Sequence, residues 1–213
     1  MNDTNVPADA LDPRAAELLA EWFGESWRTA PVAGAWWFAS DAARDARLHA
    51  RFGALMESAA RGELAAWSAT PRSRLALILL LDQLPRNCFR GTAGAFATDA
   101  RALAETQRGL ERGDDRALNP WERMFFYMPL QHAEDDAVQA QAVERYSALA
   151  AAVPREFAKT FEDAAQYARL HRDIVARFGR FPHRNALLGR ESTVAEREWL
   201  AAGAPDFGQG AAR

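Results

Sequence analysis

The feature that most restricts the fold is a capping side chain placed directly before a proline. Such an oxygen binds free N–H groups of a helix start, and proline suits the first helical turn. The chain does this three times, at Asp12-Pro13, Thr70-Pro71 and Asn119-Pro120. Asn119 is followed three positions later by Glu122, and Thr193 by Glu196, so both match the capping-box pattern. Helix starts are therefore marked along the whole chain.

Glycines at helix C-termini complete these signals, because glycine adopts the left-handed conformation that closes a helix. Gly113, Gly179 and Gly203 occupy such positions. The signals predict helices over residues 12–23, 41–61, 71–84, 93–112, 120–128, 134–152, 155–178 and 193–202. No segment alternates with period two long enough to predict a strand. We expect an all-α fold of antiparallel helical hairpins without significant sheet, in one domain (1–213) whose ends, about 1–11 and 204–213, are flexible.

The segment 155–178 has the clearest helical periodicity. Phe157, Phe161, Ala168 and Val175 lie on one apolar stripe, and His171 falls on the same stripe. The opposite face carries charged side chains at spacings of three and four, which is typical of a solvated helix surface. His171 is therefore expected to be a core residue.

Composition restricts the class of protein. With 213 residues and 49% hydrophobic content the chain is long enough for one sizeable core, and a net charge of −3 gives no basic field for nucleic acid. The single cysteine, Cys88, excludes an internal disulfide and is expected to be a small core residue. The N-terminus does not resemble a secretion signal, and the apolar run 75–81 is too short to span a membrane. These features predict a cytoplasmic protein with no nucleic-acid or membrane partner.

Two similar segments, LPRNCFRGT (84–92) and FPHRNALLGRES (181–192), each place an Arg-Asn pair after a helix and a proline. Guanidinium and amide groups are the paired donors that phosphate or carboxylate recognition needs. They equally suit a second role, in which each turn binds the free carbonyls of the preceding helix and pairs with a structural acid. Both interpretations stay open for these residues: Arg86, Asn87, Arg90, Arg184, Asn185 and Arg190.

Asp82 and His132 are the titratable residues that most need an explanation. Asp82 shares a helical face with apolar residues and so is expected to face inward, where Arg86 or Arg184 would pair with it. His132 follows FFYMP and precedes three acids, which suit the first turn of the helix 134–152 and leave the histidine without a helical role. His132 is therefore a candidate site residue, although a structural histidine is the commoner case.

A metal site and a nucleophile have weaker sequence support. His132, His171 and His183 would need to converge with Glu134 or Asp135, and no HExxH spacing is present. Phosphate-loop, dinucleotide and GxSxG motifs are absent as well. No metal is predicted, and the sequence names no cofactor.

Four stretches in order carry a family resemblance: EWFG, LILLLDQLPRNCFRGT, ERMFFYMPLQHAED and HRDIVARFGRFPHRNALLGRES. Together they resemble the bacterial domain-of-unknown-function 924 family over almost the whole chain. The resemblance implies a tetratricopeptide-like helical array and implies no reaction. Gln131 stands where the family pattern usually has glutamate before the histidine.

Three functions of different classes follow. The first is binding of a small anion in a pocket where Arg86, Arg90 and Arg184 neutralise it and Asn87, His132 and Asn185 orient it. The second is a hydrolase that uses His132 or His183 as general base, with or without a metal held by Glu134 or Asp135. The third is a protein-interaction scaffold, which predicts exposed aromatic residues such as Trp36 and Trp37.

Overall fold

The computed structural model describes residues 11–25 and 36–209, and these residues form helices and turns without a strand. The predicted all-α class is confirmed. The α-helices are α1 (Pro13–Phe23), α2 (Ala42–Arg61), α3 (Pro71–Ile78), α4 (Leu84–Cys88), α5 (Asp99–Arg112), α6 (Pro120–Phe126), α7 (Met128–His132), α8 (Asp136–Ala152), α9 (Arg155–Phe178) and α10 (Val194–Ala201). A π turn, η2 (Leu79–Gln83), joins α3 to α4, and four 3-10 turns complete the order: η1 (Ala65–Ala69), η3 (Ala93–Phe96), η4 (Asp114–Ala117) and η5 (Pro182–Arg184).

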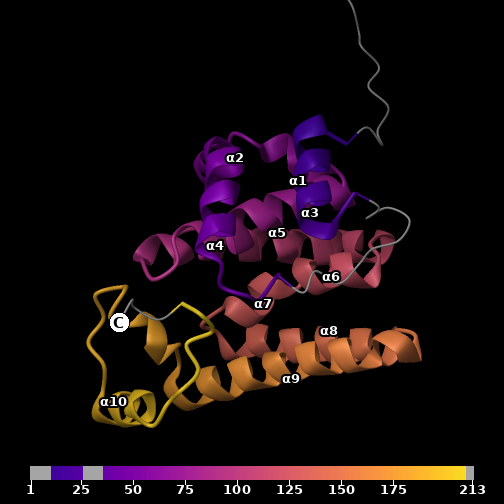
Figure 1. Cartoon of the computed structure of the whole chain (residues 1–213). Helices are drawn as coiled ribbons and strands as arrows, with labels where there is room; N and C mark the ends of the chain where they lie inside the picture. Colours follow the sequence, from indigo (N-terminus) through magenta and orange to yellow (C-terminus); the bar gives the residue numbers. More distant parts are fainter. Residues whose placement is uncertain (1–10, 26–35, 210–213) are drawn as a thin grey trace, which may run out of the picture.

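The helices are arranged in two parts (Figure 1). Helices α1 to α5 form the larger body, and α8 and α9 lie side by side along one edge of it as an antiparallel hairpin. The short helices α6 and α7 lie between these parts, and α10 lies at one end of the hairpin. The tetratricopeptide-like arrangement of the hairpins stays a prediction.

The helix ends follow the capping chemistry of the sequence. Both predicted capping boxes are formed, by Asn119 with Glu122 at α6 and by Thr193 with Glu196 at α10. Gly179 closes α9 in the left-handed conformation with φ of 71°. Local side chains therefore determine where these helices begin and end.

The core is built from aromatic side chains of several helices. Trp22 of α1 and Phe125 of α6 pack edge to face with 5.4 Å between ring centroids. Trp37 is only 5% exposed, and its indole N–H donates to the Trp22 carbonyl at 2.8 Å. On α9, Phe161 and His171 are buried on the apolar stripe, as the periodicity predicts. Trp37 is thus a core anchor and does not form an exposed partner surface.

Three predicted helix boundaries were wrong, and two of them involve proline. The helix expected over 71–84 continues through the π turn to Cys88, so Pro85 lies inside α4 and not in a turn. Pro129 lies in the first turn of α7, where a missing N–H costs nothing, so His132 belongs to a helix and not to a loop. The helix expected over 93–112 also divides, into η3 and α5.

The remaining predictions concern the chain ends and the membrane. The predicted flexible segment 1–11 lies almost wholly outside the described residues. Residues 204–209, predicted to belong to a flexible end, fold back so that Gln209 is buried. Within the described part of the chain, no helix combines the length and apolar character needed to cross a membrane.

Candidate functional site

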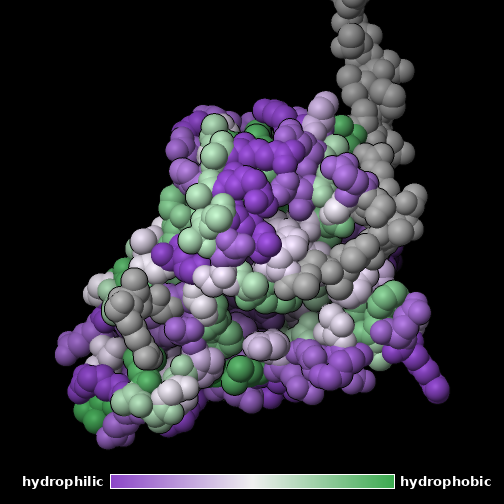
Figure 2. Space-filling view, viewed as in Figure 1, coloured by the Kyte–Doolittle hydropathy of each residue, from purple (hydrophilic) through white to green (hydrophobic). Residues whose placement is uncertain are grey.

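A cleft of about 680 Å³ separates the α8–α9 hairpin from the larger body. Figure 2 shows the hollow between these two parts, with apolar residues beside it. The lining divides by chemistry into an apolar and aromatic set of side chains, termed the aromatic wall, and a polar set, termed the polar wall. The aromatic and apolar lining includes Trp37, Phe38, Met124, Met128, Tyr146, Tyr167 and Phe207; the polar lining includes Gln83, Arg86, Asn87, Arg90, Gln131, His132 and His171. An apolar hollow with a few convergent polar groups is the usual form of a small-molecule site.

Asp82 reaches the polar wall because the helix that carries it is locally widened. Pro85 has no N–H to bind the Leu81 carbonyl, which instead accepts a hydrogen bond from the Thr98 hydroxyl at 2.5 Å. Just before the proline, the N–H of Leu84 binds the Leu79 carbonyl in the π turn. Such π turns occur frequently at functional sites. This turn places Asp82, which is fully buried, between α4 and α7.

Asp82 is held as a carboxylate by three donors. Arg86 approaches its Oδ1 at 3.2 Å, and Gln83 Nε2 donates to its Oδ2 at 2.6 Å. The third partner is His132, whose Nδ1 lies 2.8 Å from Oδ1. Burial raises the pKa of Asp82, but the charge of Arg86 and the hydrogen bonds from His132 and Gln83 lower it further, so the pKa lies below its ordinary value. Asp82 is therefore ionised at neutral pH and accepts each of these hydrogen bonds.

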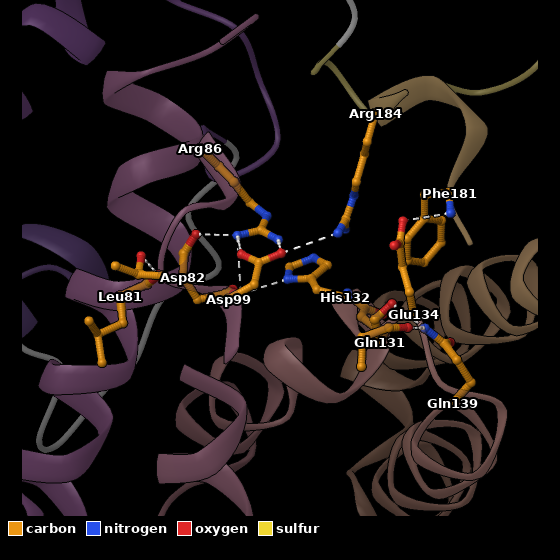
Figure 3. Close-up of polar contacts among 12 residues, drawn as sticks. Leu81, Asp82, Arg86, Asp99, Gln131, His132, Glu134, Gln139, Phe181 and Arg184 are labelled. Carbon is orange, nitrogen blue, oxygen red and sulfur yellow. Dashed lines mark hydrogen bonds and ion pairs between the residues drawn. The ribbon is translucent and has the colours of Figure 1, made fainter. Parts of the chain in front are cut away.

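His132 is a neutral imidazole in a fixed tautomer. Burial and the nearby Arg86 lower its pKa, and Asp82 raises it by less. Since Asp82 only accepts, Nδ1 carries the proton and Nε2 carries the lone pair. Nε2 accepts no hydrogen bond from any described residue, and Figure 3 shows it turned away from Asp82. His132 also lines the cleft, so its free nitrogen is available to a molecule there.

An ion-pair chain extends from Asp82 to the C-terminal part of the protein (Figure 3). Arg86 makes two hydrogen bonds of 2.9 Å to Asp99 and one of 2.7 Å to the Asp82 carbonyl. Arg184 donates to the same Asp99 at 3.2 Å and lies over the ring of Phe181 with 4.4 Å to the centroid. Burial lowers the pKa of Arg184 to about 10, and Asp99 raises it by less. Two arginines thus share one acid that the sequence did not indicate.

Two further predicted residues of the first Arg-Asn segment (84–92) bind another acid, Asp45 of α2. Asn87 Nδ2 donates to its Oδ1 at 2.9 Å, and Arg90 Nε donates to its Oδ2 at 3.2 Å. Arg90 also donates to the Gly208 carbonyl at 3.0 Å. The residues of this turn are near one another, but each is already paired within the protein.

The second Arg-Asn turn, 181–192, makes its own contacts. Arg190 binds Glu134 through two hydrogen bonds of 2.6 and 2.9 Å, and Glu134 also accepts from the Phe181 N–H at 2.8 Å. Glu134 therefore anchors this turn and does not belong to the first turn of α8, where it was expected. Asn185 Nδ2 donates to Ser192 Oγ at 3.1 Å, and Asn185 lies outside the cleft lining.

The three buried histidines belong to one cluster of aromatic rings, in which Phe181 and Phe207 lie between His183 and His171. His171 lies 6.0 Å from His132 between centroids and stacks on Phe207 at 4.1 Å. His183 packs against Phe181 and Phe207, does not line the cleft, and its Nδ1 is buried without a partner. Burial lowers the pKa of His171 and of His183 to about 3. No three His, Cys, Asp or Glu side chains of the described residues are grouped to hold a metal ion.

The structure therefore joins Asp82, Arg86, His132 and Arg184 in one chain of contacts, and sequence reasoning missed its central acid, Asp99. In the sequence Asp99 is an acid near the start of a helix. Acids are common at that position, so nothing marks Asp99 as a site residue. Gln131 and Gln209 of the cleft lining were missed as well. The buried aromatic neighbours of His132 were the one signal that placed it inside the protein.

The comparisons with known proteins agree with this architecture and name no activity. A family model described as a bacterial protein of unknown function (DUF924) matches residues 18–204. A solved structure from Agrobacterium tumefaciens, the protein of unknown function ATU0120, is similar with a TM-score of 0.75 and 42% sequence identity, covering 89% of this chain and 97% of that chain. A search of curated proteins gave no match.

Proposed function

Since the chain belongs to DUF924, a family of bacterial proteins of unknown function, we propose from the site itself that it is a hydrolase with His132 as general base. The observation that carries the proposal is the hydrogen bond of 2.8 Å between buried Asp82 and His132 Nδ1 beside the cleft. A carboxylate that binds one imidazole nitrogen fixes the tautomer and leaves the other nitrogen as base. This is the arrangement needed to accept a proton from a reacting group.

Water is the group that His132 would activate. Among the described residues the cleft lining includes no serine or cysteine, and Thr160 is its single threonine, exposed on α9. In the proposed reaction Nε2 takes a proton from water as the water oxygen attacks a carbonyl carbon. The imidazolium, stabilised by Asp82, then returns the proton to the leaving group. The reaction consumes one water and needs no covalent intermediate on the protein.

The substrate we propose is a neutral ester or amide with an apolar body. The charged groups of the polar wall are paired: Arg86 binds Asp82 and Asp99, and Arg90 binds Asp45. A charged ligand would have to compete with these pairs, whereas a neutral molecule leaves them intact. The aromatic wall supplies the surface on which an apolar body would pack.

Small-anion binding, which the sequence favoured, has less support from these contacts. It requires free guanidinium groups, and Arg86, Arg90 and Arg184 each bind a carboxylate. The protein-interaction scaffold also has less support, because Trp37 is buried in the core. Both stay proposals that the following experiment separates from hydrolysis.

The test is hydrolysis of neutral p-nitrophenyl esters and p-nitroanilides by the wild type and by His132→Ala. General-base catalysis typically contributes a factor of about 100 to 10,000, so we expect kcat/KM to fall by at least about 100-fold. His49→Ala is the matched control, because His49 is exposed and lies outside the cleft lining. Equal rates for His132→Ala and wild type would refute the base assignment. Stabilisation by phosphate or small carboxylates without hydrolysis would favour anion binding.

A further inference from the structure

Several polar side chains that line the cleft already donate N–H groups to other atoms of the protein. Gln83, Asn87 and Gln209 show the pattern most clearly, since each directs its amide nitrogen to an atom that can only accept. Gln83 Nε2 binds the Asp82 carboxylate at 2.6 Å, Asn87 Nδ2 binds the Asp45 carboxylate at 2.9 Å, and Gln209 Nε2 binds the Arg86 carbonyl at 3.0 Å. A carboxylate or carbonyl accepts only from the nitrogen, which fixes the orientation of each amide. The oxygens of these three side-chain amides therefore remain available as hydrogen-bond acceptors.

Two of the cleft-lining amide oxygens are buried without a partner among the described residues. Gln131 and Gln209 are 5% and 6% exposed, and no group within residues 11–25 and 36–209 donates a hydrogen bond to the Oε1 atom of either. The Gln131 nitrogen is directed to Met128 Sδ at 3.0 Å, which keeps its oxygen away from the sulfur. A buried acceptor without a donor is unfavourable, so each such group needs an explanation. A ligand that donates hydrogen bonds to these two oxygens would explain why they are buried.

The two histidines of the cleft add acceptors of the same kind. His171 Nδ1 lies 2.7 Å from the Tyr167 carbonyl and must carry the proton, because a carbonyl only accepts. Burial keeps the pKa of His171 at about 3, so the ring is neutral and Nε2 carries a lone pair. His132 presents its Nε2 in the same state. The wall thus offers two imidazole nitrogens and two buried amide oxygens.

We infer that the cleft recognises a neutral ligand whose polar end presents N–H or O–H donors and whose body is apolar, with a carboxamide as the best match. An anion brings further acceptors to amide oxygens and imidazole nitrogens that need donors. A cation meets Arg86 and Arg90 in the same lining, in which Asp163 and Asp206 are already bound by Lys159 and by the Gly208 N–H. The inference rests on the proposed function only in taking the same cleft as the substrate site, and it narrows the substrate class from esters and amides to donor-bearing compounds.

The strap formed by residues 205–209 contributes to this recognition. Gln209 belongs to it, and Phe207 of the strap stacks on His171 at 4.1 Å with the left-handed φ of 53° that non-glycine residues seldom adopt. Arg90 holds the strap through the Gly208 carbonyl at 3.0 Å. The strap therefore places one of the two unpartnered oxygens against the wall that carries the catalytic histidine.

The experiment measures binding of probes that share a phenyl body and differ in their polar end. Phenylacetamide and 2-phenylethanol carry donors, methyl phenylacetate is neutral without donors, phenylacetate is an anion and 2-phenylethylammonium is a cation. Calorimetry is expected to give tightest binding for the amide, about 5-fold or more tighter than for the methyl ester. Tighter binding of phenylacetate than of phenylacetamide, or no detectable binding of the amide, would overturn the inference.

Gln131→Met and Gln209→Met test the two oxygens separately, because methionine keeps the length and removes the acceptor. Each is expected to weaken amide binding by about 3- to 10-fold and to leave the methyl ester within about 2-fold. Gln166→Met is the matched control, since Gln166 is exposed on α9 outside the cleft lining. Unchanged amide affinity in both Gln131→Met and Gln209→Met contradicts the inference, and two variants keep the test valid if one fails to fold.

Binding and turnover separate this inference from the proposed function. A protein that prefers the amide but hydrolyses no ester or amide supports the recognition and refutes the hydrolase. A protein whose hydrolysis depends on His132 but that binds the amide no better than the methyl ester supports the hydrolase and refutes the recognition.

Discussion

Replacement of Asp82 by asparagine tests the centre of the site by removing one charge and no atoms of the side-chain skeleton. Asp82 is fully buried and ionised, and it accepts hydrogen bonds from Gln83, Arg86 and His132. Asparagine keeps one oxygen that can still accept from His132. Its nitrogen then faces the Gln83 amide nitrogen, which lies 2.6 Å from Oδ2 in the wild type, so two donors meet.

The expected loss follows from what Arg86 retains. Removing one partner of a buried ion pair typically costs about 3–5 kcal/mol, because the other charge is left uncompensated. Arg86 keeps two hydrogen bonds of 2.9 Å to Asp99, so the cost belongs at the lower end, about 3 kcal/mol. For a chain of this length each kcal/mol lowers the Tm by about 2–4 °C, which gives a decrease of about 6–12 °C.

Denaturant unfolding at pH 7 measures this loss, with Asp173→Asn as control because Asp173 is exposed and, among the described residues, pairs only with Arg172. The control is expected to change the free energy of unfolding by less than about 0.5 kcal/mol. A double variant, Asp82→Asn with Arg86→Met, removes the cation as well and is expected to lose less than the sum of the two single variants.

The pH dependence has a definite sign. The pKa of Asp82 is lower in the folded protein than in the unfolded chain, so its contribution is fully present above the unfolded pKa of about 3.9 and is lost as the pH falls through the folded pKa. The difference between wild type and Asp82→Asn is therefore expected to stay constant from pH 7 to pH 5. A difference below about 1 kcal/mol at pH 7, or one that decreases steadily over that range, would refute an ionised Asp82.

Three further predictions concern His132, Cys88 and Gly109. Because burial lowers the pKa of His132, the acidic limb of kcat/KM is expected below about pH 6.5, and a limb above that value in a pH–rate profile would contradict the assignment. Burial raises the pKa of Cys88 to about 11, so iodoacetamide at pH 8 is expected to alkylate the folded protein about two orders of magnitude more slowly than the unfolded chain; equal rates by mass spectrometry would contradict a buried thiol. A Cβ at Gly109 would lie 2.5 Å from Phe126 Cζ, so Gly109→Ala is expected to destabilise the protein by about 1–3 kcal/mol in spite of the better helix propensity, and an increase in the free energy of unfolding would refute this packing.

The helices were predictable wherever one local signal determines them. Asn119 and Thr193 show this, since each forms its capping box with a glutamate three residues later. The signal fails at Pro85, because a proline in the first turn of a continuing helix looks in sequence like the proline that ends one. The Thr98 hydroxyl that satisfies the freed Leu81 carbonyl comes from another helix. A contact of that kind leaves no trace in the local sequence.

Only part of the candidate site could be predicted from the sequence, because most of its pairings join distant segments. Asp82 was expected to face inward and to pair with an arginine, and Arg86 is its partner. The contact between Asp82 and His132 joins residues 50 positions apart, and no periodicity links η2 to α7. Asp99 and Asp45 likewise become the partners of the arginines only through the packing of α5 and α2. Pairing depends on tertiary contacts, and those determine the charge that the cleft presents.

The hydrogen-bonding groups of the cleft differ from the sequence prediction because tertiary contacts determine which of them are paired. The sequence predicts a donor-rich pocket because Arg86, Arg90 and Asn87 carry many N–H groups. In the structure N–H groups of these residues bind Asp99, Asp45 and a backbone carbonyl, so fewer donors are available to a ligand than the sequence suggests. The same ion pairs that use the donors also keep Asp82 ionised, and Asp82 in turn directs the proton of the neutral imidazole to Nδ1. A neutral base and an acceptor-lined wall are therefore two consequences of one set of contacts. A single substitution at Asp82 is expected to disturb both.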